Sequence, residues 1–116
     1  MSSGVKGVVR SGDRVLLVQQ TYGDRLLWNL PGGFVQRGET VAETLVREML
    51  EECGLEVRIS FMLGVYYDVS VFRHDHNVVF VCEVEDFARD PLSMEIARFA
   101  FFPMHRLPPL RDGVQR

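Results

Sequence analysis

Residues Gly32–Leu55 read GGFVQRGETVAETLVREMLEECGL, and this stretch decides how the rest of the 116-residue chain is organised. Its centre predicts an α-helix over Val41–Cys53. Thr40 with Glu43 three residues later is typical of a capping box, and Gly54 stands where the end of a helix favours glycine. The apolar sector of this helix is wide enough to dock on a sheet, and consists of Ala42, Leu45, Val46, Met49, Leu50 and Cys53. We therefore expect one face of the helix to lie in the core.

The acids near the end of this helix break two local rules. At ~100° of rotation per residue, Glu48, Glu51 and Glu52 fall within one arc of about 100°. Like charges one turn apart repel, and the helix macrodipole disfavours negative charge near the C-terminus. A divalent cation would reverse both penalties, and three hard oxygen donors suit Mg²⁺ or Mn²⁺. The alternative interpretation of the acids alone is a solvated acidic face.

The spacing of the fixed residues distinguishes these two interpretations. From Gly33, five residues lead to Glu39 and seven more lead to the pair Arg47-Glu48. Aliphatic, acidic and glycine positions then follow in the order Met49, Glu51-Glu52, Gly54 and Leu55. This segment resembles the Nudix box, G-x5-E-x7-R-E-U-x-E-E-x-G-U with U a bulky aliphatic residue, and every fixed position is filled. The preceding stretch 28–32, WNLPG, resembles the lead-in found in many members.

The resemblance implies a fold as well as a site. It implies an α/β protein, a Nudix-type α/β/α sandwich with a mixed β-sheet, in which the box forms a loop–helix–loop against the sheet. The length of 116 residues fits a single domain over residues 1–116.

The chemistry that the resemblance implies is hydrolysis of a diphosphate linkage in a nucleoside diphosphate joined to another moiety, with Mg²⁺ as cofactor and Mn²⁺ as its substitute. The metal-ligand candidates carried onto this sequence are Glu48, Glu51 and Glu52, with the backbone carbonyl of Gly32 and, through water, Glu39. Glu48 is alternatively the general base, and Arg47 orients a box carboxylate, either Glu39 or Glu48, so the catalytic candidates are Arg47, Glu48 and Glu52. A second hypothesis is a catalytically silent module that binds a nucleotide or metabolite; members of that kind commonly lose box acids, and this chain retains all of them.

Candidates outside the box rest on weaker patterns. Glu95 is a candidate for an additional metal ligand or base from the far side of the cleft, with an ordinary surface residue as the alternative. Trp28, Tyr66 and Phe72 are candidates to stack on a nucleobase, although aromatic residues in strands more often belong to the core.

Charge and composition limit the partners. A net charge of −3 argues against an extended nucleic-acid surface, but it is compatible with a small phosphorylated molecule when a metal supplies local positive charge. The sequence shows neither a signal-peptide pattern nor a long apolar span, so we expect a cytoplasmic protein with no membrane partner. Many Nudix proteins are dimers, and the resemblance therefore leaves a homodimer open.

The remaining chain predicts mostly strands. We expect a hairpin of Val5–Arg10 with Arg14–Gln20, and a strand over Glu56–Leu63 followed by a bend or bulge at Gly64. The other expected elements are a hairpin of Tyr66–Phe72 with Val78–Val84 around a tip at Arg73–Asn77, a strand at Phe99–Phe102, and the start of a terminal helix at Leu110–Arg116. The β-branched run in Val78–Val84 predicts a central strand.

Overall fold

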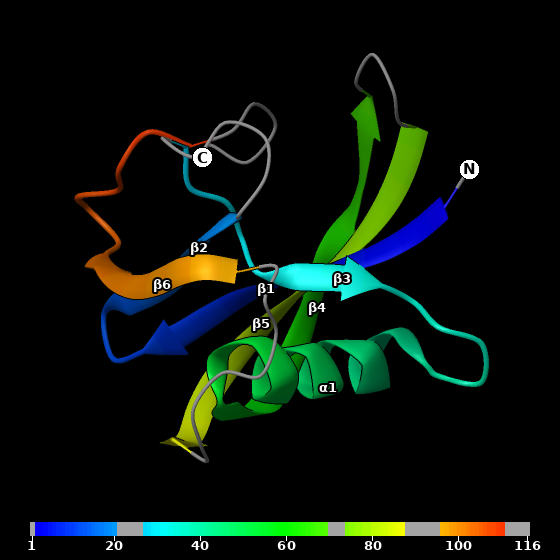
Figure 1. The fold of residues 1–116 in the computed structure, drawn as a ribbon, viewed down its shortest axis with the longest axis horizontal. Helices are drawn as coiled ribbons and strands as arrows, with labels where there is room; N and C mark the ends of the chain where they lie inside the picture. Colours follow the sequence, from blue (N-terminus) through cyan, green and yellow to red (C-terminus); the bar gives the residue numbers. More distant parts are fainter. Residues whose placement is uncertain (1, 21–26, 70–73, 88–95, 111–116) are drawn as a thin grey trace.

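The computed structural model describes residues 2–20, 27–69, 74–87 and 96–110 (Figure 1). These residues form one mixed six-stranded sheet with a helix packed on it, which confirms the expected α/β fold class. The strand order is β4-β5-β1-β2-β6, and β3 pairs with β1 beside this path. The elements are β1 Ser2–Ser11, β2 Arg14–Gln20, β3 Gly32–Phe34, α1 Val41–Cys53, β4 Leu55–Val69, β5 His74–Phe87 and β6 Ile96–Pro103.

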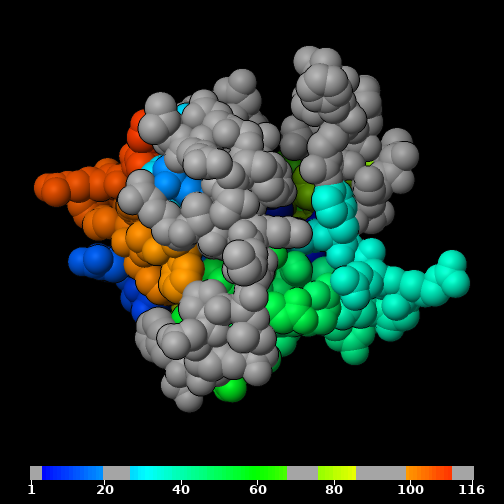
Figure 2. Space-filling view, in the orientation of Figure 1, coloured from blue at the N-terminus to red at the C-terminus, as the bar shows by residue number. Residues whose placement is uncertain are grey.

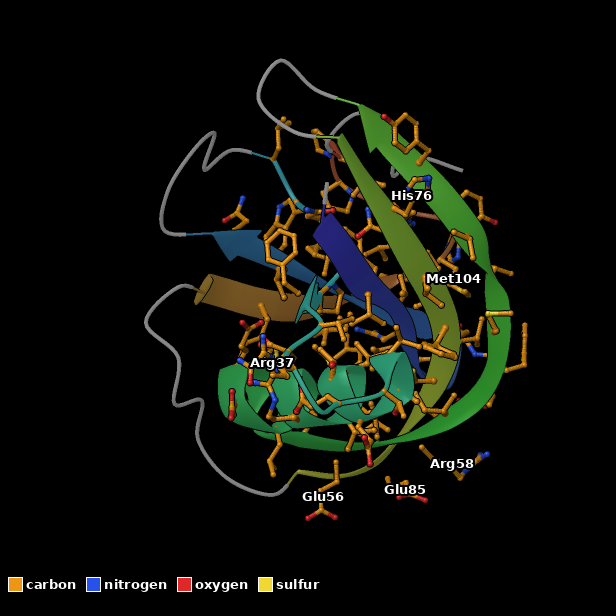
Figure 3. All side chains as sticks on the ribbon, turned by 90° about the vertical axis from the view of Figure 1, so that its right-hand side faces the viewer. Arg37, Glu56, Arg58, His76, Glu85 and Met104 are labelled. Carbon is orange, nitrogen blue, oxygen red and sulfur yellow. The ribbon has the colours of Figure 1, made fainter. Side chains whose placement is uncertain are left out.

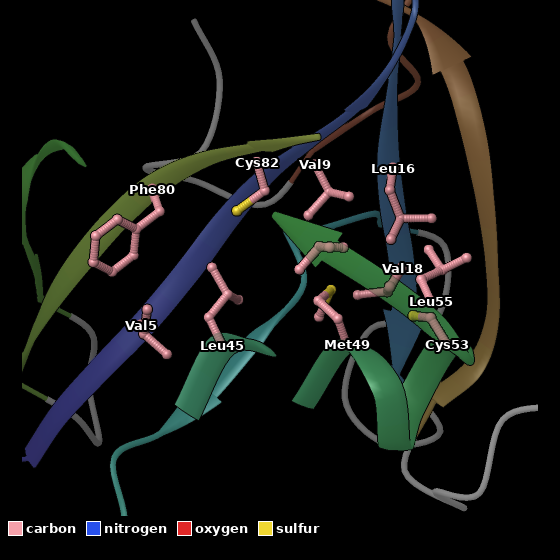
Figure 4. Packing of buried hydrophobic residues seen from close by; sticks show 11 residues of the cluster. Val5, Val9, Leu16, Val18, Leu45, Met49, Cys53, Leu55, Phe80 and Cys82 are labelled. Atoms are coloured by element: carbon pink, nitrogen blue, oxygen red, sulfur yellow. The ribbon is translucent and has the colours of Figure 1, made fainter. Parts of the chain in front are cut away.

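The main core lies between α1 and one face of the sheet. The apolar positions of α1 that recur with the helical period, Leu45, Met49 and Cys53, are buried there. They meet side chains that alternate along the strands, such as Val5 and Val9 of β1 (Figure 4). This packing fixes the rotation of α1 about its own axis, and with it the direction in which the acidic side chains leave the helix.

A second, smaller core lies on the other face of the sheet. Leu17 points there because it alternates with its buried neighbours in β2, and it packs with Trp28 and Leu110. Short bridges hold this layer, pairing Trp28 with Leu110 and Asn29 with Val18. Of the expected terminal helix, Leu110–Arg116, the structure describes only Leu110. No helix in the described ranges is both long enough and apolar enough to cross a membrane.

Strand β1 has more partners than the expected hairpin provides. Its antiparallel pairing with β2 is confirmed only next to the turn, at Arg10 with Val15 and Ser11 with Arg14. The rest of β1 pairs in parallel with β5, while its first half pairs antiparallel with β3. Because β2 pairs with β1 over only two residue pairs, the rest of that edge of β1 is free to pair with β3. The start of the Gly32–Leu55 stretch thereby becomes part of the sheet.

Strands β4 and β5 form one long antiparallel hairpin. Gly64 marks a register shift inside a continuous β4, which confirms the expected bulge but not a separate strand on each side of it. The expected tip at Arg73–Asn77 is too long, because β5 begins at His74 and its first residues are already paired with β4. The Val78–Val84 run is central as expected, since β5 lies between β4 and β1.

Candidate active site

Both ends of α1 are fixed by local hydrogen bonds. At the N-terminus, the Glu43 amide donates to Thr40 Oγ1 at 3.1 Å, and the Thr40 amide donates to Glu43 Oε1 at 2.9 Å. At the C-terminus, Gly54 takes the left-handed conformation with φ 68°, and its amide reaches the carbonyl oxygens of the last turn. The predicted capping box and glycine cap are both confirmed. The four acids and one arginine of the site are therefore carried by, or held against, a helix with defined ends.

The guanidinium of Arg47 lies close to three carboxylates. It donates from Nε and Nη2 to the two oxygens of Glu39, at 2.7 and 3.1 Å, in a bidentate pair. Its Nη1 donates to Glu51 Oε1 at 2.9 Å and lies 3.7 Å from Glu48 Oε1. One guanidinium thus faces three acids, which leaves the cluster with an excess of negative charge.

Thr44 is the second residue that holds Glu39. It is completely buried, and its hydroxyl donates to Glu39 Oε1 at 2.9 Å while lying 3.1 Å from the Thr40 carbonyl oxygen. The hydrogen bond from Arg47 lowers the pKa of Glu39, and the bond from Thr44 adds to this effect. The same pairing with Glu39 raises the pKa of Arg47. Glu39 is thus held in its ionised form and in one orientation.

Glu48 lies against the backbone of β3. A β-carbon added to Gly33 would stand 2.6 Å from Glu48 Oε2 and 2.7 Å from Glu48 Cδ. The Glu48 side chain is 13% exposed, so most of it is enclosed by this contact and its surroundings. Only glycine at position 33 leaves room for this carboxylate beside the sheet.

Gly32 is required for a different contact. A β-carbon there would stand 2.0 Å from the carbonyl oxygen of Val5 and 2.9 Å from Lys6 Cα. The two consecutive glycines are therefore needed for different reasons: Gly32 allows β3 to approach β1, and Gly33 leaves space for the Glu48 side chain. The following loop leaves the body of the molecule beside α1, with Gln36, Arg37 and Gly38 exposed (Figure 2).

Glu52 is the most enclosed of the helix acids. The residue is 6% exposed, and its Oε1 atom is shut off from solvent. A carboxylate in such a place is costly unless positive charge or hydrogen bonds compensate it. Its neighbour Cys53 shows how apolar the surroundings are, because burial, together with the nearby Glu52 charge, raises the pKa of that thiol to about 12.

This arrangement of a capped helix, a glycine pair and an arginine-centred acid cluster can be compared with known proteins. The NUDIX domain model matches residues 2–116 of the chain. The chain belongs to the Nudix family.

Relatives and solved structures agree with this assignment. YjhB of Bacillus subtilis, whose name gives a provisional ADP-ribose pyrophosphatase assignment, is 33% identical over 91% of this chain and 52% of its own length. The ADP-ribose pyrophosphatase of Methanocaldococcus jannaschii is 37% identical over 69% of this chain and 49% of its own. The chain thus spans about half the length of these relatives.

The solved structures extend the likeness to three dimensions. The crystal structure of a UDP-X diphosphatase superposes with a TM-score of 0.80 and 26% identity, covering 94% of this chain and 54% of that one. An ADP-ribose pyrophosphatase from Streptococcus suis superposes with a TM-score of 0.78 and 27% identity, covering 99% of this chain and 83% of that one. The Nudix fold of this chain is therefore shown over nearly its whole length.

The residues fit a metal through two of the predicted ligands. Glu48 and Glu52 are one helical turn apart, both largely enclosed, and carboxylate oxygens are donors that Mg²⁺ accepts. In the part of the chain that is described, however, no group of three or more acidic, histidine or cysteine side chains is gathered to hold a metal ion. Glu51 and Glu39 instead meet Arg47. Mg²⁺ commonly uses only one or two protein carboxylates and fills its shell with water and phosphate oxygens, so a pair such as Glu48 and Glu52 matches the number of protein donors that it uses.

Of the three aromatic candidates, the structure describes Trp28 and Tyr66. Trp28 is 8% exposed, and its ring meets Phe102 edge-on with centroids 4.8 Å apart, so it forms part of the second core. Tyr66 is 39% exposed on β4, opposite Asn77 of β5. Phe72 and Glu95 lie outside the described residues, and their predicted roles stay predictions.

Two features of the site were not foreseen from the sequence. Thr44 gave no signal, because a threonine inside a helix is ordinary and its hydroxyl partner, Glu39, precedes the helix. The sequence gave no signal for strand β3 either, because the three residues GGF carry no alternating pattern and form a strand only by pairing with β1. The two adjacent glycines before the capped helix did predict a close backbone approach or a positive φ, and the contact of Gly32 with Val5 confirms the close approach, but they did not predict a strand.

Proposed function

We propose that this Nudix protein is a divalent-metal-dependent hydrolase of the diphosphate linkage in a nucleoside diphosphate joined to another moiety. The observation that carries the proposal is the placement of Glu48 and Glu52. Both are largely enclosed, and Glu48 sits in the space that Gly33 leaves open. Neither placement helps the helix by itself, because like charges at this spacing repel and both lie toward its negative end.

In this proposal Glu48 and Glu52 hold Mg²⁺, with Mn²⁺ as a substitute. The bound ion supplies charge neutralisation for the diphosphate oxygens and acidifies water. The role of Arg47 is to keep Glu39 and Glu51 in place, since its donors already point at their oxygens. Glu39 would then contact the metal through a water molecule, and Glu48 has the alternative role of general base.

The substrate class we infer is a nucleoside diphosphate bearing a sugar, such as ADP-ribose or a UDP-sugar. The names of the relatives and structures above support this class, and an acidic cluster with one arginine supports a ligand that arrives with its charge neutralised by metal. The net charge of −3 supports a small molecule over an extended nucleic acid.

The second candidate is a silent Nudix module that binds a nucleotide without cleaving it. Retention of Glu39, Arg47, Glu48, Glu51 and Glu52 argues against it. The two hypotheses differ in one respect, which is whether a metal-dependent product forms.

The experiment is a substrate panel with product identification. ADP-ribose, UDP-glucose, nucleoside triphosphates and dinucleoside polyphosphates are incubated with the protein and Mg²⁺ or Mn²⁺, and the products are separated by chromatography. We expect a nucleoside monophosphate and a phosphorylated sugar from a sugar nucleotide, and none after chelation. Binding of a panel member by calorimetry without any product would overturn the hydrolase in favour of the silent module.

A further inference from the structure

Lys6 is the only lysine of the chain, and it lies in the middle of the sheet. Its strand, β1, has β5 on one side and β3 on the other (Figure 3), so the side chain stands on a face of the sheet and not at an edge. Lysine is depleted in strands, and its ammonium group is costly to bury. A half-buried lysine at this position breaks a local rule, and such exceptions are expected at functional sites.

The register fixes the face on which Lys6 stands. The next position, Gly7, faces α1, because a β-carbon added there would lie 3.2 Å from Leu45 Cδ2. Side chains alternate along a strand, so Lys6 points to the opposite face. Glu48 reaches the sheet from the α1 side, over Gly33. Lys6 and Glu48 therefore approach β3 from opposite faces.

Strand β3 connects Lys6 with the acid site. Lys6 is paired with Gly32, and the next residue, Gly33, leaves space for Glu48. Neither glycine has a side chain that would separate a ligand at Glu48 from Lys6. In the described part of the chain β3 pairs with β1 alone, so the two faces of the sheet meet at the other edge of β3.

Glycines surround Lys6 on its own face of the sheet. Gly32 is its partner in β3, and Gly4 precedes it by two positions in β1. Its partner in β5 is Val79, and Gly64 of β4 lies opposite Val79. The face therefore has little side-chain volume of its own next to Lys6, and a ligand has room there.

Two uncharged polar side chains lie over these glycines. A β-carbon on Gly4 would collide with Asn77 Oδ1, so the Asn77 amide leans from β5 over β1. A β-carbon on Gly64 would stand 3.3 Å from the Tyr66 hydroxyl, so this hydroxyl lies over β4. An ammonium, an amide and a hydroxyl thus lie on neighbouring strands of one face, and a few polar groups of this kind fix the orientation of a small ligand.

The proposed metal site keeps an excess of negative charge. It brings together one guanidinium and the carboxylates of Glu39, Glu48, Glu51 and Glu52. One Mg²⁺ does not neutralise this group, and a diphosphate adds further negative charge. A cation beside β3 would offset the repulsion, and Lys6 is the only charged residue among those that pair β1 with β3.

We propose that Lys6 binds a phosphate group of the substrate on the face of the sheet away from α1. This inference rests on the proposed function, because it takes the diphosphate to lie at Glu48 and Glu52. Lysine binds phosphate as a compact point charge. The phosphate is the one that stays on the nucleoside, since Asn77 and Tyr66 beside Lys6 are uncharged and match the hydroxyl and amide groups of a nucleoside.

The test is binding in the presence of a chelator, so that neither metal nor hydrolysis takes part. AMP and UMP are compared by NMR titration with adenosine and uridine, which lack the phosphate. We expect Lys6→Met to weaken AMP or UMP binding at least about tenfold, because a charge-assisted hydrogen bond is lost, and to leave the nucleosides unchanged. Lys6→Arg keeps the charge and should retain most of the affinity. Arg58→Met removes the same charge from an exposed position on β4 and is the matched control.

The single lysine also permits a direct readout. An amine-reactive ester acetylates Lys6 and the N-terminal amine, and mass spectrometry follows the two rates separately. AMP or UMP should slow the reaction of Lys6 and leave that of the N-terminal amine unchanged, whereas adenosine and uridine should slow neither.

Circular dichroism of each variant shows whether it folds. Equal losses of nucleotide and nucleoside affinity in a folded Lys6→Met protein, unchanged AMP and UMP affinity, or acetylation of Lys6 that neither nucleotide slows would overturn the proposal. None of these measurements requires turnover. Failure to hydrolyse any substrate would therefore count against the proposed function alone, and failure of Lys6 to respond to phosphate would count against this inference alone.

Discussion

Replacing Gly33 by alanine should impair catalysis while the protein stays folded. The added β-carbon would lie 2.6 Å from Glu48 Oε2 and 2.7 Å from Cδ, where ordinary contact begins at 3.4 Å. The carboxylate must therefore withdraw by about 0.8 Å. A misplacement of about 1 Å at a reacting centre costs up to ~10²-fold in rate, so we expect kcat to fall roughly 10- to 100-fold.

The fold should tolerate this change for two reasons. Gly33 is not among the glycines with positive φ, so alanine meets no backbone strain. The atoms in its way belong to the outer part of a side chain, and removing a glycine from the unfolded chain stabilises the folded state by about 0.4–1 kcal/mol. The free energy of unfolding should therefore change by less than about 1 kcal/mol, measured by urea denaturation.

Two further variants distinguish an effect of Gly33 on the Glu48 carboxylate from an effect of the glycines on the β3 strand. Gly32→Ala directs its β-carbon at the Val5 backbone, 2.0 Å from the carbonyl oxygen, and should destabilise the fold instead. In a Glu48→Ala background, Gly33→Ala should cause no further loss of activity, since its target is gone. Wild-type kcat in Gly33→Ala, or an equal loss added to that of Glu48→Ala, would refute the assignment of Gly33 as the space for Glu48.

Three predictions concern the cluster around Arg47. The pKa of Glu39 is lowered in the folded state. Ionised Glu39 therefore stabilises the fold above the pKa that it has in the unfolded chain, and this contribution is lost as pH falls through its folded pKa. Glu39→Gln should remove this dependence and flatten the acid side of a plot of Tm against pH. Thr44→Val removes a buried hydroxyl from Glu39 and should cost about 1 kcal/mol of stability while raising the pKa of Glu39 in a carbon-13 NMR titration; Thr44→Ser should restore both, and an unmoved Glu39 titration would contradict the contact. Arg47→Lys keeps the charge but loses the bidentate geometry, so kcat should fall at least about tenfold with KM little changed, as steady-state kinetics will show.

The helix of the site could be predicted from the sequence, and the structure confirms the expected bounds. Its bounds, Val41–Cys53, depend on the Thr40–Glu43 capping box and on Gly54, and these are contacts between residues close together in the chain. The acids near its end were found for the same reason, because helical spacing alone brings them to one side.

What could not be predicted depends on contacts between distant segments. The parallel pairing of β1 with β5 joins residues about 73 positions apart, as the Arg10–Glu83 ion pair shows, and no local pattern specifies it. The sequence left Glu39 and Glu48 open as the partner of Arg47, and the fold shows that Arg47 pairs with Glu39, and also with Glu51, more closely than with Glu48. Trp28 was a candidate to stack on a nucleobase, and its burial beside Leu110 depends on a contact with a segment far along the chain, which no local pattern specifies.

In the proposed function, enclosed acids of α1 hold the catalytic metal, and Glu52 is the most enclosed of them. The measurement is turnover of ADP-ribose against Mg²⁺ concentration for the wild type, Glu52→Gln and the exposed control Glu56→Gln, with Mn²⁺ binding measured by calorimetry on the same samples. We expect Glu52→Gln to lose at least about 10²-fold in kcat/KM together with its Mn²⁺ affinity, and Glu56→Gln to match the wild type. Wild-type turnover and Mn²⁺ affinity in a folded Glu52→Gln protein would contradict it.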